Sequence, residues 1–301
     1  MSSKIRLWHV EDTQGWTKKV FDNIDYERCD RVEDADYILV PNTFTTNYHD
    51  QNLEWLKGIY KQSVSNKPYI AFLHDDPTGL MIQDGIDYTQ NGILFRTSFY
   101  KSQSSQTEYA LPSFDKNADE SFLPLAQDNV YIGFCGALTH SIRGECLDAL
   151  TDNPLITTKF RIRNRFHLHF TKEEQNIHER QFTEVLRECP YQLCSRGAGN
   201  FSHRFYETLM HGRIPVLVDT DIPLPNDIQI DYDKFIVIAK TAKELPEKLI
   251  DWHNKHDIIQ SQTHCRKLWE EHLSPSGFAK SVHEICKAHL VNGFNPMPAK
   301  I

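Results

Sequence analysis

The sequence lacks the features that mark several common classes of protein. Its seven cysteines include no Cys-x-x-Cys pair, so neither a zinc site nor a dithiol redox centre is indicated, and the thiols are expected to be reduced. No segment approaches the ~20 apolar residues of a membrane-spanning helix, and the beginning of the chain does not have the pattern of a secretory signal. These absences predict a cytoplasmic protein without a transmembrane segment.

The chain also lacks any concentration of positive charge. Lysine and arginine number 33 against 41 aspartates and glutamates, which gives a formal net charge of −8. Proteins that bind nucleic acid neutralise its phosphates with clustered basic side chains, so nucleic acid is not an expected partner. The 15 histidines do not combine with carboxylates at the spacing of a metal site, and no essential metal or other cofactor is expected.

Short apolar segments alternate with polar and amphipathic stretches along the chain. The apolar segments have the length and the β-branched or aromatic content of strands. We predict strands at 4–10, 36–41, 68–74, 92–98, 130–138, 191–194, 213–219 and 234–239. We predict helices at 49–64, 141–150, 172–187, 204–212, 244–253 and 260–272. Alternation of this kind is typical of α/β proteins with a parallel sheet.

Residues 110–129 separate two such alternating halves. This stretch is polar and contains two prolines, and the length of the chain suits two ordinary domains. We predict one domain over 1–127 and a second over 128–301 that includes the C-terminal helices. Open parallel sheets bind ligands beyond the carboxyl ends of their strands, so the loops that follow the strands are the expected functional positions.

The stretch "CSRGAGNFSHRFYETLMHGRIPVLVD" carries the strongest chemical signal. Gly197 and Gly199 would let a ligand approach the backbone, and Arg196 supplies a permanent charge whose forked donors suit phosphate. Asn200 and Ser202 are good caps for the helix that follows, and the free N–H groups at a helix start attract an anion. The loop is therefore predicted to hold a diphosphate.

Glu207 lies in the same predicted helix, on a different face from its apolar residues. A carboxylate there could accept hydrogen bonds from the paired hydroxyls of a ribose. Gly212 then ends the helix before a strand that is buried on both sides. The alternative interpretation is purely structural: a loop, a helix and a strand with a glycine stop, because the stretch matches neither the Walker nor the dinucleotide fingerprint.

The longer string "RGAGNFSHRFYETLMHGRIPVLVDTDIPLP" closely resembles the signature of the exostosin-type glycosyltransferases. Other segments occur in the order expected of that family's catalytic domain: "ADYILVP", "PYIAFLHDDPTG", "ILFRTSFYKS", "ALPSF", "GFCGALTHSIRGECLDAL" and "CRKLWEEHLSPSGF". The resemblance spans most of the chain and is strongest over 130–225.

This resemblance implies a GT-B architecture, in which two Rossmann-like domains with parallel sheets face an interdomain cleft. The second domain would hold a nucleoside-diphosphate-sugar, expected to be UDP-linked, for inverting transfer to a glycan acceptor in surface polysaccharide biosynthesis. A lipid-linked acceptor would place the chain peripherally at a membrane. Arg204 would bind phosphate or brace the loop. The implied donor-binding residues are Arg143, Ser195, Arg196, Gly197, Gly199, Asn200, Ser202, Arg204 and Glu207.

Inverting transfer needs a general base for the acceptor hydroxyl. His74, Asp75 and Asp76 directly follow a predicted strand of the first domain, and the family resemblance favours this loop without settling which residue acts. The alternative interpretation is a turn, with Asp75 as a cap and His74 packed at the strand end. Glu11 and Asp12, after the first strand, form a second candidate pair.

Two other functions remain open on the sequence. Fucosyltransferase-like enzymes of the same architecture also place a glutamate and a strand after the donor loop, and they would use a GDP-linked donor. A protein of another class, a non-catalytic module that binds a nucleotide or a glycan, could retain the pocket without the base. Carboxylates after the third predicted strand count against the module.

Overall fold

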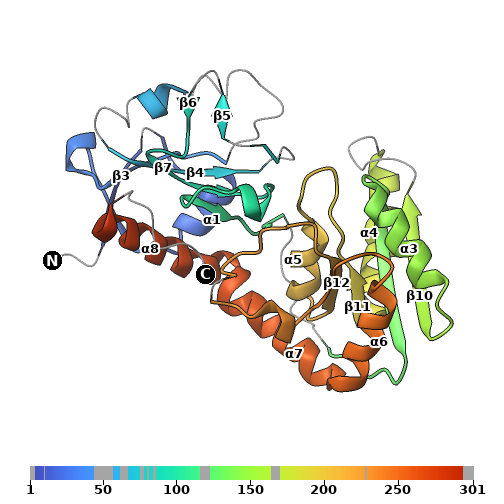
Figure 1. Ribbon diagram of the computed structural model, residues 1–301. Helices are drawn as coiled ribbons and strands as arrows, with labels where there is room; N and C mark the ends of the chain where they lie inside the picture. The colour runs from blue at the N-terminus through green and yellow to red at the C-terminus, as the bar shows by residue number, and fades with distance from the viewer. Residues whose placement is uncertain are drawn as a thin grey trace. The chain divides into compact units, whose positions relative to one another are not determined.

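The computed structural model describes residues 4–9, 11–43, 57–61, 67–74, 78–79, 81–83, 86–115, 123–163, 170–227 and 229–293. The chain forms two compact units (Figure 1). The first unit consists of Met1–Asp115, Asp221–Gln229 and Glu271–Ile301. The second consists of Lys116–Thr220 and Ile230–Glu270.

The first unit is built on a six-stranded parallel sheet. Its strands are β1 (Ile5–Trp8), β2 (Tyr26–Arg28), β3 (Tyr37–Leu39), β4 (Tyr69–Leu73), β7 (Gly92–Arg96) and β8 (Glu108–Ala110). Their order across the sheet is β2-β1-β3-β4-β7-β8. The short strands β5 (Ile82–Gln83) and β6 (Ile86–Asp87) form a separate antiparallel pair. Because β2 and β3 lie on opposite sides of β1, the strand order reverses there.

Helices α1 (Gly15–Phe21) and α8 (Pro275–Asn292) pack together (Figure 1), and α8 also contacts β1. Helix α8 begins with proline at its first position, and Ser274 caps it by accepting a hydrogen bond from the Gly277 N–H at 3.0 Å. Phe278 and Val282 of this helix are fully buried in one core with Phe72 and Phe95 of the sheet.

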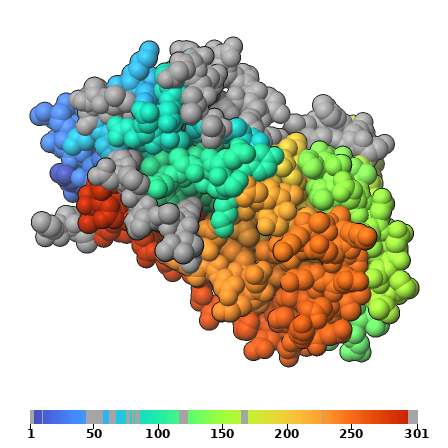
Figure 2. Space-filling view, in the orientation of Figure 1, coloured from blue at the N-terminus to red at the C-terminus, as the bar shows by residue number. Residues whose placement is uncertain are grey.

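The position of α8 differs from the predicted domain boundary. The second domain predicted from the sequence runs over 128–301, whereas 271–301 and 221–229 belong to the first unit. The reason is the apolar face of α8, which covers the first sheet, and Tyr37 of β3 also donates a hydrogen bond to the Cys286 carbonyl at 2.7 Å. In the space-filling view the red C-terminal residues accordingly lie beside blue N-terminal residues (Figure 2).

The second unit contains a five-stranded parallel sheet. Its strands are β9 (Val130–Ala137), β10 (Ile156–Arg163), β11 (Tyr191–Leu193), β12 (Ile214–Val218) and β13 (Val237–Ala239), in the order β10-β9-β11-β12-β13. Its helices are α3 (Ser141–Thr151), α4 (Lys172–Glu188), α5 (His203–Met210), α6 (Leu245–Lys255) and α7 (Ile258–Leu268). A Cβ atom at Gly133 would lie 2.4 Å from Val185, so glycine lets α4 pack closely on β9.

The fold class predicted from the sequence is confirmed, because each half contains one parallel α/β sheet as a GT-B chain requires. The predicted strands correspond to β1, β3, β4, β7, β9, β11, β12 and β13. Only 57–61 of the predicted helix at 49–64 are described, and these are helical. The predicted elements include neither β10 nor α8, and they also lack α1, β2, β5, β6 and β8, which are too short to show a period of their own. Within the described residues, no helix is long and apolar enough to span a bilayer.

Candidate functional site

The predicted donor-binding residues gather at one place in the second unit. Strands β10 and β11 lie on opposite sides of β9, so the order of the strands reverses at β9. The carboxyl ends of the strands at such a reversal are where open parallel sheets bind their ligands. Arg143 lies in α3, which follows β9. The other predicted donor residues lie in the loop after β11 or in α5. The strand order therefore places both segments at the position where open α/β sheets bind ligands.

Arg143 joins these two segments. Its guanidinium donates hydrogen bonds to the carbonyl of Ala137 at 2.7 Å, of Arg196 at 2.9 Å and of Ser195 at 3.3 Å. Burial, with a smaller contribution from the positive charge of Arg204, lowers the pKa of Arg143 to about 10. The side chain therefore still carries its charge at neutral pH.

Gly197 lies close to Arg143 and Thr139. A Cβ atom at this position would lie 3.2 Å from Nη2 of Arg143 and 3.3 Å from Oγ1 of Thr139. The Gly197 N–H donates to the carbonyl of Phe201 at 3.0 Å, which closes the loop on itself. The missing side chain thus makes room for the Arg143 guanidinium. The neighbouring Gly199 is buried within the same loop.

Arg196 is only 8% exposed, although it lies in a loop. Its Nη2 donates to the carbonyl of Ala198 at 3.1 Å, so the charged end folds back over its own loop. Arg143, Arg196 and Arg204 lie near one another here, together with the carboxylates of Glu207 and Glu145. The resulting excess of positive charge favours an anionic ligand.

His140 also belongs to the site and was missed by the sequence analysis. It occupies the N-cap of α3, where its Nδ1 accepts a hydrogen bond from the Ile142 N–H at 3.2 Å. Burial lowers the pKa of His140, and the charges of Arg196 and Arg143 lower it further. The ring is therefore neutral at neutral pH. A histidine directly before a predicted helix was the signal that could have identified it.

Arg204 and Glu207 form an ion pair within α5, with 3.0 Å between Nη1 and Oε2. Arg204 also donates from Nη2 to the carbonyl of Cys135 in β9 at 2.8 Å, and its guanidinium lies 3.6 Å from the centre of the Phe182 ring. These contacts tie α5 to β9. Two roles were predicted for Arg204, binding phosphate or bracing the loop, and these contacts favour the second.

Asn200 and Ser195 are engaged within the protein. The Asn200 side chain is fully buried and exchanges two hydrogen bonds with Thr220, accepting from its hydroxyl at 2.6 Å and donating to its carbonyl at 3.2 Å. The hydroxyl of Ser195 lies 3.5 Å from the sulfur of Cys146. These side chains position the loop.

The Ser202 side chain differs from those of Asn200 and Ser195. Ser202 occupies the N-cap of α5 without a capping hydrogen bond from its side chain, and its hydroxyl is buried with no hydrogen-bond partner in the described part of the chain. Leaving a buried hydroxyl unpaired costs about 1–3 kcal/mol. A group that binds at the start of α5 would remove that cost.

The predicted catalytic loop of the first unit is described only in part. Asp75 and Asp76 lie outside the described residues. His74, at the end of β4, stacks on the Trp16 ring with 4.3 Å between ring centres and an interplanar angle of 21°. This contact agrees with the interpretation that packs His74 at the strand end.

His9, which directly follows β1, was missed as a candidate base. It is 5% exposed, and its Nδ1 lies 2.5 Å from the carbonyl oxygen of Glu11. A carbonyl only accepts, so Nδ1 carries the proton in the neutral ring and Nε2 is left as the basic nitrogen. Nε2 is buried and makes no hydrogen bond to any described residue. Glu11 is exposed, and Asp12 pairs with Arg28 at 2.9 Å.

No family model matches the chain, and no curated protein matches it. Among solved structures, the apo form of the lipopolysaccharide outer core galactosyltransferase WaaB is similar with a TM-score of 0.47 and 12% identity, over 95% of this chain and 99% of that one. The lipopolysaccharide glycosyltransferase WaaG has a TM-score of 0.43 and 8% identity, over 92% and 99%. MurG of Acinetobacter baumannii has a TM-score of 0.36 and 10% identity, over 94% of this chain and 99% of that one. The resemblance to exostosin-type enzymes stays a prediction.

Proposed function

We propose that the chain is a glycosyltransferase that moves a sugar from a nucleoside-diphosphate donor to a glycan acceptor in polysaccharide or glycan biosynthesis. The observation that carries the proposal is the group of Arg143, Arg196 and Arg204 around the start of α5, at the point where the strand order of the second sheet reverses.

A departing nucleoside diphosphate gains negative charge as the bond to the sugar breaks. Arginines and the N–H groups at a helix start stabilise that charge without a metal ion. In the proposed site Arg196 and Ser202 contact the diphosphate, while Arg143 holds the loop that presents Arg196. Arg204 keeps Glu207 in place to accept hydrogen bonds from the ribose hydroxyls. The exostosin resemblance supports a UDP-linked donor and an inverting outcome.

The first unit would supply the base that deprotonates the acceptor hydroxyl. The loop with His74, Asp75 and Asp76 is the proposal from the sequence. His9 is added to it because its ring is oriented by the Glu11 carbonyl and retains a basic nitrogen. A general base of this kind contributes about 10²- to 10⁴-fold to the rate.

Thermal unfolding with UDP, GDP and CDP, followed by an assay for donor hydrolysis, tests the proposal. A nucleotide at 100 times its Kd stabilises the folded state by about 2.7 kcal/mol. We expect UDP to raise the unfolding temperature and UDP-sugars to be hydrolysed slowly. Stabilisation by GDP alone would favour a fucosyltransferase-like enzyme, and stabilisation without turnover across many acceptors would favour the binding module. Failure of every nucleotide to stabilise would contradict the donor site.

Ser202→Ala tests the start of α5 directly. Because the Ser202 hydroxyl is buried without a partner among the described residues, its removal is expected to raise the free energy of unfolding of the unliganded protein by about 1–3 kcal/mol. A lost hydrogen bond to a charged diphosphate, about 1.5–3 kcal/mol, should weaken UDP binding about 10- to 150-fold in calorimetric titration.

Ser274→Ala is the matched control, since Ser274 caps α8 with a real hydrogen bond. It should lower the free energy of unfolding by about 1 kcal/mol and leave the Kd for UDP unchanged. Equal UDP affinity in Ser202→Ala and the unmodified protein would contradict the contact.

A further inference from the structure

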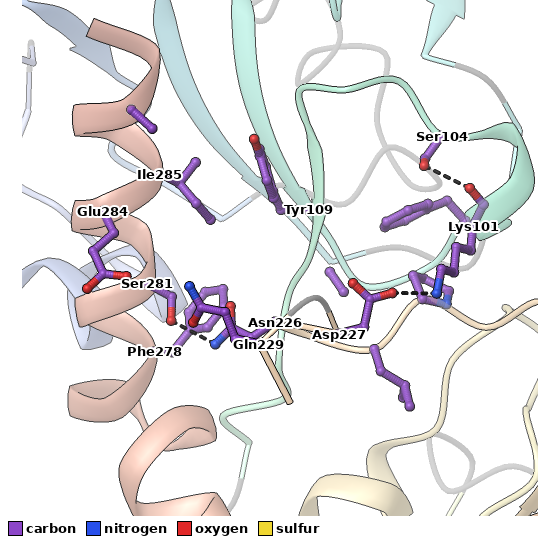
Figure 3. Close-up of a pocket in the computed structure, with 15 residues that line it drawn as sticks. Lys101, Ser104, Tyr109, Asn226, Asp227, Gln229, Phe278, Ser281, Glu284 and Ile285 are labelled. Atoms are coloured by element: carbon purple, nitrogen blue, oxygen red, sulfur yellow. Dashed lines mark hydrogen bonds and ion pairs between the residues drawn. The ribbon is translucent and has the colours of Figure 1, made fainter. Parts of the chain in front are cut away.

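A cavity of about 220 Å³ lies within the first unit (Figure 3). It is formed by three segments that are distant in the sequence: the residues that follow β7 together with β8, the segment 221–229, and helix α8. None of these residues belongs to the donor site of the second unit.

The segment 221–229 is held by hydrogen bonds at its first residue, Asp221. Asp221 has a φ of 59°, a conformation that costs free energy for a residue other than glycine. Its carbonyl accepts a hydrogen bond from the Lys101 N–H at 3.0 Å. Its carboxylate accepts from the N–H and the hydroxyl of Ser102, the latter at 2.5 Å. These bonds hold the strained backbone, so this wall of the cavity is preformed.

An ion pair and a hydrogen bond hold the same segment at Asp227 and Asn226. Asp227 forms an ion pair with Lys101 at 2.7 Å. Asn226, with a φ of 56°, donates from its amide to the hydroxyl of Ser281 in α8 at 2.7 Å. In Figure 3 the contact between Asn226 and Ser281 lies on the left, beside α8, and the contact between Asp227 and Lys101 lies on the right. The wall is thus attached both to α8 and to the segment after β7.

An aromatic ring forms part of the apolar lining. The hydroxyl of Tyr109 lies 2.9 Å from Nε2 of His289, and the contact holds the ring in one orientation. Phe278, Ile285 and Leu224 add apolar surface. Burial raises the pKa of Tyr109 to about 12, so its ring faces the cavity as a neutral phenol.

Polar groups lie at the rim. Gln229 and Glu284 are exposed, and their side chains make no hydrogen bond to any residue that the structure describes. Amide and carboxylate oxygens accept hydrogen bonds, and the amide also donates two. The cavity therefore combines an apolar floor with hydrogen-bonding groups at its edge, which is the usual composition of a small-molecule site.

The volume limits the size of the ligand. An engineered cavity of about 150 Å³ is enough for benzene, whereas sites for drug-sized ligands measure about 300–1,000 Å³. At about 220 Å³, the cavity suits one six-membered ring with substituents.

The charges at the cavity exclude several classes of ligand. An anion would meet Glu284 and Asp227, and the only lysine among the lining residues is already paired with Asp227. A cation would find a single unpaired carboxylate among the described lining residues, that of Glu284, because Asp227 is already paired with Lys101, and the rest of its surface would face apolar side chains without a counter-charge. A fatty chain would remove water from the ion pair between Lys101 and Asp227, and it would offer that pair no hydrogen bonds in return. A neutral ring that carries hydroxyls satisfies each of these limits.

We propose that this cavity binds one pyranose ring of a saccharide. The apolar face of the ring packs against Tyr109, and its hydroxyls bond with Gln229 and Glu284. The assignment of this ring to the acceptor glycan rests on the proposed function, whereas the binding itself does not.

Saturation-transfer NMR on the full chain tests the cavity with methyl glycosides of glucose, galactose, mannose and N-acetylglucosamine. At least one glycoside should receive saturation at its ring protons. Gln229→Ala and Glu284→Ala should each weaken its binding about 3- to 10-fold, the effect of one hydrogen bond. Lys280→Ala is the control, because Lys280 is an exposed residue of α8 outside the cavity.

Three results would overturn the inference: no saturation of any glycoside, equal affinity in the two rim variants and the control, or binding of tetramethylammonium in place of the sugars. The Kd for UDP is measured on the same samples. Loss of glycoside binding with UDP binding intact counts against the cavity alone. Loss of UDP binding with glycoside binding intact counts against the donor site alone.

Discussion

Removal of the general base is expected to lower the rate of sugar transfer about 10²- to 10⁴-fold and to leave the affinity for UDP nearly unchanged. The variants are Asp75→Asn, Asp76→Asn and His9→Gln. Each replaces the proposed base by an amide of similar size that cannot take up a proton. A base acts on the acceptor, so its loss lowers transfer without weakening the donor complex. Transfer rates at saturating donor and calorimetric titration with UDP provide the two measurements.

Asp22→Asn is the control for this series. It changes a carboxylate at the end of α1 in the same unit, one that is exposed and paired with Lys18. This variant should transfer sugar at the rate of the unmodified protein. If only His9→Gln is slow, the basic nitrogen of His9 is the base. If only an aspartate variant is slow, the loop after β4 supplies the base. Normal turnover in all three variants would place it elsewhere.

Arg196→Ala is expected to weaken UDP binding about 10- to 150-fold, because a hydrogen bond to a charged group contributes about 1.5–3 kcal/mol. Arg196→Lys should recover part of this loss, since an ammonium keeps the charge and loses the fork that binds two phosphate oxygens. Calorimetric titration with UDP measures both variants. Because the Arg196 side chain is buried, urea unfolding of the same samples checks that each variant still folds.

Arg161→Ala is the control for the arginine variants. Arg161 is an exposed arginine of β10 in the same unit, and the carboxylate of Glu184 lies 3.9 Å from its guanidinium. Its removal lowers the positive charge of the second unit by the same amount as Arg196→Ala. Equal UDP affinity for the two variants would mean that Arg196 acts only through the general charge of the unit or through its own loop.

Much of the site could be predicted from the sequence because its signals are local. A cationic loop, an amphipathic helix and a buried strand follow one another between Cys194 and Asp219, and the structure has them as the loop after β11, then α5 and β12. Arg143 was named from the family resemblance. Its approach to the same loop depends on parallel pairing between β9 and β11, which are separated by more than 50 residues.

The roles of individual side chains in this loop could not be predicted in the same way. Gly197 is adjacent to Arg143, Asn200 is bonded to Thr220, and Ser202 is left without a partner. Each of these facts depends on which distant atom lies nearby. His9 shows the same limit, because an isolated histidine after a strand has no pattern, and only the position of the Glu11 carbonyl fixes its tautomer.

The sequence by itself determined that the chain is an α/β protein with two parallel sheets, since strand and helix periodicities are properties of neighbouring residues. Only the tertiary structure decided the strand orders, the return of α8 and the segment 221–229 to the first unit, and the cavity that they enclose. The physical reason is that the apolar face of a helix indicates that this face is buried but does not indicate which sheet covers it. That choice depends on the fit of Phe278 and Val282 between side chains of strands about 200 residues earlier in the chain.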